Sequence, residues 1–400
     1  MKKNYFFDII GFITINIFFL SIAFPFVLSS ILSIIIFIII SNFISDRYSF
    51  ILLGLSLFFL VIIAEVSLNL LPYNPASGCA EDEFKIPGKE YYKPSKSVFK
   101  FPCGSPDNVR ISGDLTLIEK TYVDFFTDSN GYRNSFEFNN NDYVVIGDSF
   151  TVGVTVSQED MLSEQLSKIL DSKVYNASFP TGPSGYHGIW QRMKRITQHD
   201  FQSIFLIFEG NDFFCSIEEV YGGIPPQKNP IYYTFDTIQR LKLYSFSYGL
   251  MNKVVSYYHL KESPLKINVK EIGNQNVGFL NWYIDVSERT KYCNLDNWNE
   301  VFSFLDEIEN LSLVVFIPTK YRVYNHMFSN KKLPNLQGEF LQNLSKEKNF
   351  NYLDLTNALI ERSNKLIEIG EYTFGRGDTH WNKNGITVAA EEISKKINPK

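Results

Sequence analysis

The sequence predicts an α/β fold in which helices cover both faces of a parallel sheet. Three short apolar runs, rich in β-branched and aromatic residues, have the composition of strands buried on both sides; they are residues 143–146, 203–209 and 311–318. Segments with helical spacing of apolar residues separate these runs. Strands that alternate with helices in this way are typical of a parallel sheet between two helical layers.

Taken in order, each expected strand is followed by a helix. After residues 143–146 we expect a helix with Ser157 at its N-cap and with five apolar residues spaced for one face: Met161, Leu162, Leu166, Ile169 and Leu170. The second strand, 173–179, leads through a loop containing Gly182, Gly185 and Gly188 to a helix at 189–198. The further elements are a strand at 203–209, a helix at 298–310, a strand at 311–318, a helix at 335–348, a strand at 351–355, a helix at 358–369 and a last amphipathic helix after Asn382.

Residues 1–72 differ in composition from the rest of the chain. They hold six charged side chains, namely Lys2, Lys3, Asp8, Asp46, Arg47 and Glu65. The uncharged run from Ile9 to Ser45 is 37 residues long. One helix of that length would reach about 55 Å, well beyond a hydrocarbon core of roughly 30 Å. Because Pro25 divides the run, we expect two membrane spans, about 6–24 and 26–44, and a third at about 49–70.

The number of spans decides the compartment. A cleavable signal peptide is the competing interpretation, but its apolar core would be too long and no small-residue cleavage site precedes Asp46. Under the positive-inside rule, Lys2, Lys3 and Arg47 favour a cytoplasmic start and a cytoplasmic turn at 45–48. Three spans then predict a multi-pass anchor in the cell membrane and an extracytoplasmic domain, in the periplasm or on the outer face. Two spans would leave that domain in the cytoplasm.

Beyond the anchor, residues 73–120 read as a linker or irregular segment, and residues 121–400 as one domain. An insertion at about 213–298 is too long to be a simple loop and includes an expected helix at 237–258. Its aromatic residues could form a lid or a sugar-binding surface, although packing within the insertion is the more ordinary role.

A net charge of −5, without a basic cluster, argues against a nucleic-acid partner.

The four cysteines, Cys79, Cys103, Cys215 and Cys293, match neither a zinc-ribbon spacing nor a C-x-x-C redox motif. Cys79 and Cys103 flank one segment just past the anchor and could form a disulfide in an oxidising compartment; buried free thiols are the alternative. No metal-ligand constellation or phosphate-binding glycine loop is present in the sequence. We therefore expect neither a metal nor a cofactor.

Three short polar motifs lie next to predicted strands or helices, at positions where α/β proteins commonly carry catalytic residues. Ser149 ends Gly-Asp-Ser directly after the strand 143–146, on a tight turn into a helix. Asn211 lies in Gly-Asn-Asp directly after the strand 203–209. Asp378 and His380 lie in Gly-Asp-Thr-His-Trp-Asn, before the last helix, for which Asn382 is the expected N-cap. Taken alone, Gly-Asp-Ser is as consistent with a capping serine as with a nucleophile.

Together and in this order, the motifs resemble the signature blocks of the SGNH hydrolases, also called the GDSL-type esterase family. The resemblance covers about residues 127–400 and includes Thr127–Asn134, a lead-in similar to that of membrane-attached members. It implies a flavodoxin-like three-layer α/β/α sandwich with a parallel sheet, here preceded by a helical transmembrane segment. Two features depart from the common pattern: Phe150 replaces the leucine of GDSL, and two residues rather than three lead from the acid to the histidine.

The resemblance also implies the roles of the site residues. Ser149 is the expected nucleophile, His380 its base, and Asp378 the acceptor that orients the imidazole. The oxyanion hole would combine the Ser149 backbone N–H, the Asn211 side-chain amide and a glycine N–H. Gly182 is the expected glycine, because Asn-Ala-Ser before it resembles the family's lead-in, and Gly185 is the alternative. Asp148 is expected to brace backbone amides of the nucleophile turn.

The sequence therefore predicts a membrane-anchored serine esterase that removes O-acyl groups, in the first place O-acetyl, from an envelope or exported glycan through an acyl-serine intermediate. Its substrate would be an acylated carbohydrate or a small ester. The alternative is an O-acyltransferase to a polysaccharide with the same triad, because the D-x-H-W form resembles polysaccharide O-acetylation relatives. In alginate O-acetylation proteins the Asp/His pair precedes the serine, whereas here it follows.

The transferase would need a multi-span membrane partner, since three spans suit an anchor better than an acyl conduit, and for this reason hydrolysis is the preferred interpretation. A non-catalytic glycan-binding or assembly protein is the alternative from another class. A complete Ser/His/Asp/Asn set weakens that last possibility, because a binding module has no use for it.

Overall fold

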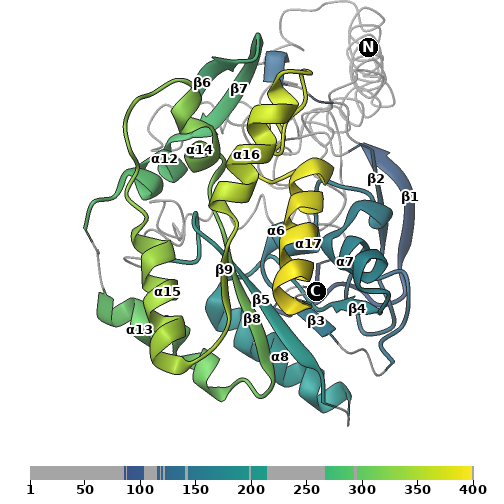
Figure 1. Cartoon of the computed structure of the whole chain (residues 1–400). Helices are drawn as coiled ribbons and strands as arrows, with labels where there is room; N and C mark the ends of the chain where they lie inside the picture. The colour runs from purple at the N-terminus through teal and green to yellow at the C-terminus, as the bar shows by residue number, and fades with distance from the viewer. Residues whose placement is uncertain are drawn as a thin grey trace, which may run out of the picture. The chain divides into compact units, whose positions relative to one another are not determined.

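The computed structural model describes residues 85–86, 88–102, 115–117, 119, 122–139, 143–197, 200–213, 266–291 and 295–398, which belong to one compact unit (Figure 1). The expected membrane spans, all four cysteines and the expected helix at 237–258 lie outside these residues. Within the described ranges, no helix combines the length and the apolar character needed to cross a membrane.

A five-stranded parallel sheet lies at the centre. Its strands are β3 (Tyr143–Ile146), β4 (Val174–Asn176), β5 (Gln202–Phe208), β8 (Leu311–Ile317) and β9 (Tyr352–Asp354). They are arranged in the order β4-β3-β5-β8-β9, and every neighbouring pair is parallel. Counted along the chain, this is the 2-1-3-4-5 order of flavodoxin-like sheets, so the expected α/β class is confirmed. The winding reverses between β3 and β5, and folds of this kind bind ligands outside the carboxyl ends of the strands at that point.

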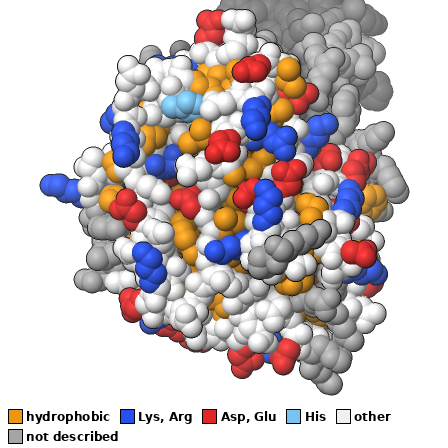
Figure 2. Space-filling view, in the orientation of Figure 1, with side chains coloured by type: hydrophobic (Ala, Val, Ile, Leu, Met, Phe, Trp, Pro, Cys, Tyr) orange, Lys and Arg blue, Asp and Glu red, His pale blue; other side chains and the backbone are white. Residues whose placement is uncertain are grey.

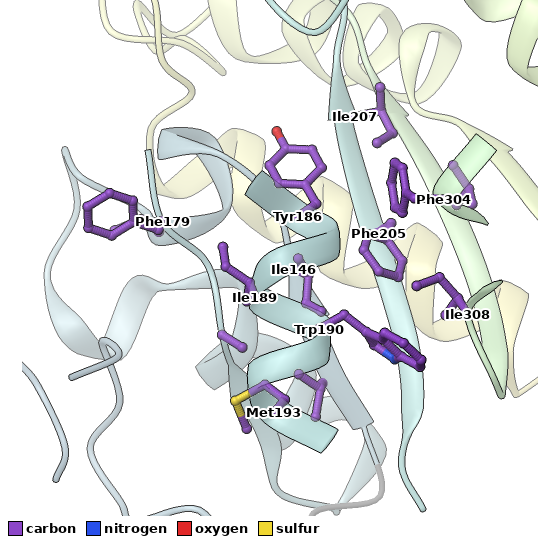
Figure 3. Close-up of a cluster of buried hydrophobic side chains, with 14 of the residues drawn as sticks. Ile146, Phe179, Tyr186, Ile189, Trp190, Met193, Phe205, Ile207, Phe304 and Ile308 are labelled. Carbon is purple, nitrogen blue, oxygen red and sulfur yellow. The ribbon is translucent and has the colours of Figure 1, made fainter. Parts of the chain in front are cut away.

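Both faces of the sheet are buried, which explains why the strands are apolar without alternation. In β5, Phe205 and Ile207 belong to one cluster, whereas Ile204, Leu206 and Phe208 belong to the other. Helices α8 (Pro183–Ile196), α13 (Leu295–Phe302) and α15 (Leu336–Lys348) contribute to the first cluster. Helices α7 (Leu162–Leu170), α14 (Lys320–Tyr324), α16 (Thr356–Ile367) and α17 (Lys383–Ile397) contribute to the second. Figure 3 shows the first cluster where α8 packs on the sheet.

Three helices begin three or more residues from their expected start, and one of them is α13, which begins at Leu295 rather than at residue 298. Residues 158–160 form a 3-10 turn, η2 (Gln158–Asp160), and α7 begins only at Leu162. The Ser157 hydroxyl does not cap a helix but accepts a hydrogen bond from the Asp124 backbone N–H at 3.2 Å. Ile169, expected on the buried face of the helix, is 46% exposed. The prediction of a helix in this stretch is therefore confirmed. Its predicted start and the predicted burial of Ile169 are wrong.

The helix expected at 189–198 begins at Pro183, and so Gly185 and Gly188 are helical rather than in a loop. Proline is favoured in the first turn of a helix, because its missing N–H has no partner there in any case. The low helix propensity of the glycines concealed this start. Close packing explains the glycine at position 185, because a Cβ there would lie 2.3 Å from Thr181 Oγ1 and 2.7 Å from a Glu90 carboxylate oxygen.

The segment expected to be a linker contributes to the core. β1 (Ser97–Pro102) pairs antiparallel with β2 (Tyr122–Phe126). Tyr92 is fully buried, with ring centroids 5.3 Å from Phe125 and 5.0 Å from Phe179. A short 3-10 helix, η1 (Leu115–Leu117), precedes β2 and buries Leu117 completely. The described part of residues 73–120 is thus packed against the domain.

The expected insertion carries structure of its own in its described part. β6 (Ile267–Ile272) and β7 (Gln275–Leu280) form an antiparallel hairpin, which is followed by α12 (Asn281–Glu288). Val277 and Phe279 of the hairpin are buried in the second cluster. The remaining short elements are α6 (Ser149–Val152), η3 (Ser303–Glu307) and η4 (Asn325–Met327). Over the described part of the face seen in Figure 2, acidic and basic side chains are intermixed.

Candidate active site

Ser149 lies at the first position of α6, directly beyond the carboxyl end of β3. The turn before it requires Gly147, because a Cβ there would lie 2.2 Å from Thr151 Oγ1 and 3.0 Å from the Leu206 carbonyl oxygen. The Asp148 carboxylate caps the helix by accepting a hydrogen bond from the Phe150 N–H at 2.9 Å. The prediction that Asp148 braces backbone amides of this turn is confirmed.

The structure brings Ser149, His380 and Asp378 together. Ser149 Oγ lies 2.7 Å from His380 Nε2, and His380 Nδ1 lies 2.6 Å from Asp378 Oδ1. The same carboxylate oxygen accepts a hydrogen bond from the His380 backbone N–H at 2.8 Å. The two-residue step from acid to histidine therefore suffices to aim the carboxylate at the imidazole, and the three side chains have the geometry of a serine-hydrolase triad.

The charge of Asp378 determines which nitrogen of His380 carries hydrogen. Burial alone would raise the pKa of Asp378, but the charge and hydrogen bonds of His380, together with the charge of Lys320, hold that pKa below its ordinary value. An ionised carboxylate only accepts hydrogen bonds, so we assign the hydrogen to Nδ1. Nε2 then carries no hydrogen and accepts the hydrogen of the Ser149 hydroxyl, as a general base must.

The loop that carries the pair, residues 375–380 (the acid loop), is held from three sides. Lys320 Nζ donates hydrogen bonds to three of its carbonyl oxygens. The Gly278 N–H of the β6–β7 hairpin donates to the Arg376 carbonyl at 3.0 Å. Directly after the loop, Trp381 Nε1 donates to the Phe150 carbonyl of the nucleophile helix α6 at 2.9 Å. Beyond the loop, the Asn382 side chain caps α17 as predicted.

The three candidate groups of the oxyanion hole follow three adjacent strands. Gly182 comes after β4, Ser149 after β3 and Asn211 after β5. The loop before Gly182 is joined to the nucleophile turn, because the Phe179 N–H donates to the Gly147 carbonyl at 3.2 Å. The Gly185 N–H is already used, since it donates to the Gly182 carbonyl at 2.9 Å. This favours Gly182 over Gly185, and the oxyanion role itself stays a prediction.

Gly210 and Asp212, on either side of Asn211, each have a role in the structure of this turn. A Cβ at Gly210 would lie 2.4 Å from the Phe208 ring and 2.7 Å from the Tyr283 ring, so only glycine lets both rings approach. The buried Asp212 carboxylate accepts hydrogen bonds from the Phe208 N–H at 2.7 Å and from the Tyr186 hydroxyl at 3.0 Å. Gly-Asn-Asp is therefore a turn closed by aromatic packing and by an aspartate, with Asn211 at its centre.

The lead-in segment Thr127–Asn134 supports the nucleophile helix α6 through the side chain of Arg133. Arg133 is fully buried, and its guanidinium donates to the carbonyl oxygens of Val152 and Val156, at 3.2 and 2.8 Å, and to that of Gly153. It also donates to the Asp124 carbonyl in β2 at 2.7 Å. A buried guanidinium is stable only when its donors are satisfied. Here they tie the end of α6 to β2.

Sequence reasoning missed Arg133 and Lys320 as parts of this site. A signal existed for Lys320, because Pro318-Thr319-Lys320 follows a buried strand directly, at the edge where parallel sheets gather functional groups. Arg133 lies within the family-like lead-in, but nothing in its spacing shows that its side chain is buried. In the described part of the chain, no group of three His, Cys, Asp or Glu side chains is placed to hold a metal ion.

Residues 299–400 match a family described as the SGNH hydrolase-like domain of the acetyltransferase AlgX. The match runs from α13 to the C-terminus; it contains Asp378 and His380 but not Ser149 or Asn211. No curated protein matches the chain at a significant level. The resemblance to SGNH hydrolases is thus confirmed for the C-terminal part. Together with the Ser149–His380–Asp378 geometry, the match defines a serine enzyme that acts on ester bonds.

A buried carboxyl group beside the triad makes the stability of the fold depend on pH. Burial raises the pKa of Asp148 to about 6, although the nearby charge of His380 acts in the opposite direction. A group whose pKa is raised in the folded state stabilises the fold fully below its ordinary pKa, and this contribution is lost as the pH rises through about 6.

Asp148→Asn keeps an acceptor for the Phe150 N–H but cannot ionise. We therefore expect its melting temperature to rise relative to that of the wild type as the pH increases from about 5 to about 8. The measurement is thermal unfolding of the full chain across that range. Asp171→Asn, an exposed αL position that asparagine tolerates, is the control. A constant difference between Asp148→Asn and wild type over the whole range would contradict the expectation.

Proposed function

We propose that this protein is a membrane-anchored O-acyltransferase that places acyl groups, in the first place acetyl, on hydroxyls of an envelope or exported polysaccharide. One observation carries the proposal: the Asp378–His380 pair that is hydrogen-bonded to Ser149 lies in the segment that matches an acetyltransferase family. Hydrolysis is the interpretation that the sequence favours. The match supports the alternative, transfer, instead.

The site residues provide for both halves of the reaction. Ser149 Oγ attacks the carbonyl carbon of an acyl donor while its proton passes to His380 Nε2, 2.7 Å away. Asp378 stabilises the imidazolium that forms, and the proposed Ser149, Gly182 and Asn211 donors stabilise the oxyanion. The tetrahedral intermediate then collapses, the bond to the leaving group breaks, and that group takes the proton from His380. An acyl ester on Ser149 remains.

In the second half a sugar hydroxyl attacks the acyl-serine and gives its proton to His380. The Ser149 oxygen departs and recovers this proton, so the enzyme is regenerated and the acyl group is on the sugar. Water attacking in place of the sugar would make the protein an esterase. Ser149 and His380 are partly exposed at the carboxyl edge of the sheet, and a donor and an acceptor can therefore reach them in turn.

The first prediction from this proposal concerns the nucleophile. Ser149→Ala should lower acyl-transfer or esterase turnover by roughly 10⁴-fold or more, and His380→Ala by a similar amount, because triad members act as a unit. For the same reason the double variant should lose little more than either single one. Turnover of a chromogenic acetyl ester and mapping of a fluorophosphonate label provide the measurements. A label on another serine would remove Ser149 from the reaction, whereas no label on any serine would favour the non-catalytic interpretation.

The second prediction separates transfer from hydrolysis. The full chain is mixed with a chromogenic acetyl ester, with and without a panel of oligosaccharides. Because transfer needs an acceptor, we expect a fast burst of chromophore equal to the enzyme, slow turnover in water alone, and faster turnover with acetylated sugar as the product when a suitable oligosaccharide is present. Steady release of free acetate that no oligosaccharide in the panel accelerates would show an esterase.

The third prediction concerns topology. The charges of Lys2, Lys3 and Arg47 and three expected spans support a catalytic domain outside the cytoplasm. Acyl groups then have to cross the membrane, and a multi-span partner would supply them. An alkaline phosphatase fused after Lys400, which is active only when exported, should be active. A fluorescent protein that matures in the cytoplasm, fused at the same position, should remain dark, and strong fluorescence would contradict the three-span arrangement.

A further inference from the structure

One buried cation lies beside the triad and has no place in the reaction steps. Lys320 is 4% exposed and begins α14, directly after β8. Its ammonium nitrogen lies 2.7 Å from the Asp378 carbonyl oxygen, 2.9 Å from that of Gly375 and 3.1 Å from that of Arg376. The Phe279 ring of β7 lies 5.3 Å away and covers the ammonium. An ammonium has three hydrogens to donate, and three carbonyl oxygens of one loop surround this one.

Lys320 is itself held in place from the sheet. Thr319 caps α14 through its hydroxyl, which accepts from the Arg322 N–H at 3.2 Å. The Arg322 guanidinium forms a buried ion pair with Glu209 at the end of β5. The Glu209 carboxylate also accepts from the Thr319 N–H at 2.8 Å. A rigid set of contacts therefore leads from the strand end before Asn211 to Lys320 and on to the acid loop.

We propose that Lys320 is a positioning residue for acyl transfer: its ammonium fixes the acid loop so that Asp378 faces His380, and its positive charge stabilises the ionised Asp378 carboxylate. The inference rests on the proposed function, since it assigns Lys320 to the same triad. An apolar side chain of similar length would fill the space, but the three loop carbonyls would lose the ammonium as a donor. The Gly278 N–H would still donate to the Arg376 carbonyl and the Asp378 N–H to the Gly375 carbonyl, whereas the bond from Lys320 to the Asp378 carbonyl would be lost.

Loss of the charge has a consequence that loss of packing alone does not have. Among the described residues outside the acid loop, charged groups that act on the Asp378–His380 pair include Lys320 on α14 and Asp148 on the nucleophile turn. Within the acid loop, Arg376 is paired with Glu119. Removing the positive charge of Lys320 makes it easier to add a proton to the pair. The acid side of the pH–rate profile should therefore move to higher pH.

The test follows the rate at which a fluorophosphonate labels Ser149 in the full chain from about pH 5 to 9, with thermal unfolding measured on the same samples. Lys320→Met should label roughly 10–100-fold more slowly, because the acid loop is less firmly placed, and its acid limb should move to higher pH. Lys320→Arg keeps the charge, so its acid limb should stay at the wild-type position. The matched control is Lys348→Met, which removes a surface lysine paired with Asp306.

A Lys320→Met protein that melts at a lower temperature but labels at the wild-type rate, with an unchanged pH profile, would overturn the inference and leave Lys320 a purely structural residue. If Lys320→Met does not fold, Lys320→Gln replaces it. Glutamine retains amide donors without the charge, and the same shift of the acid limb is expected; an unshifted limb would overturn the inference. Absence of Ser149 labelling in the wild-type protein would instead refute the proposed function.

Discussion

The site depends on one hydrogen bond, between Ser149 Oγ and His380 Nε2, which joins residues 231 positions apart in the chain. A contact of this kind works only if both ends are held within a few tenths of an ångström. The protein connects the two ends directly: Trp381 donates to the Phe150 carbonyl at 2.9 Å, and the Thr155 hydroxyl donates to the Trp381 carbonyl at 3.1 Å. The residue after Ser149 and the residue after His380 are thus hydrogen-bonded to each other.

Buried charges surround this contact at the carboxyl edge of the sheet. Arg133 holds the end of α6, Lys320 holds the acid loop, and the Arg322–Glu209 pair holds α14 against β5. Each has a desolvation cost, and buried ion pairs seldom add much net stability compared with apolar packing. Their hydrogen bonds end on loops and helix ends that carry site residues. Positioning of the site is therefore the better explanation for them than stability.

The hairpin β6–β7 changes how the insertion after β5 is understood. Its Gly278 N–H donates to the acid loop, its Phe279 ring covers Lys320, and the Tyr372 hydroxyl donates to the Ile272 carbonyl at 2.7 Å. The described part of the insertion supports the catalytic loop, and its Ile272, Val277 and Phe279 side chains are buried in the second cluster. Residues far from any signature block are consequently part of the structure that aligns Asp378 with His380.

The sequence by itself determined the strands of the parallel sheet, their alternation with helices, and the choice of Ser149, Asp378 and His380 as candidate site residues, because apolar runs, turn glycines and capping residues are local signals. Only the tertiary structure gives a reason to favour Gly182 over Gly185 for the predicted oxyanion role, since that reason depends on where α8 begins and which N–H its first turn uses. It also decided the strand order and the exposure of Ile169. The burial of Arg133 and Lys320 had to come from the structure as well. A charged residue looks the same in sequence whether it faces water or a set of carbonyl oxygens, and those carbonyls come from segments that only folding brings together.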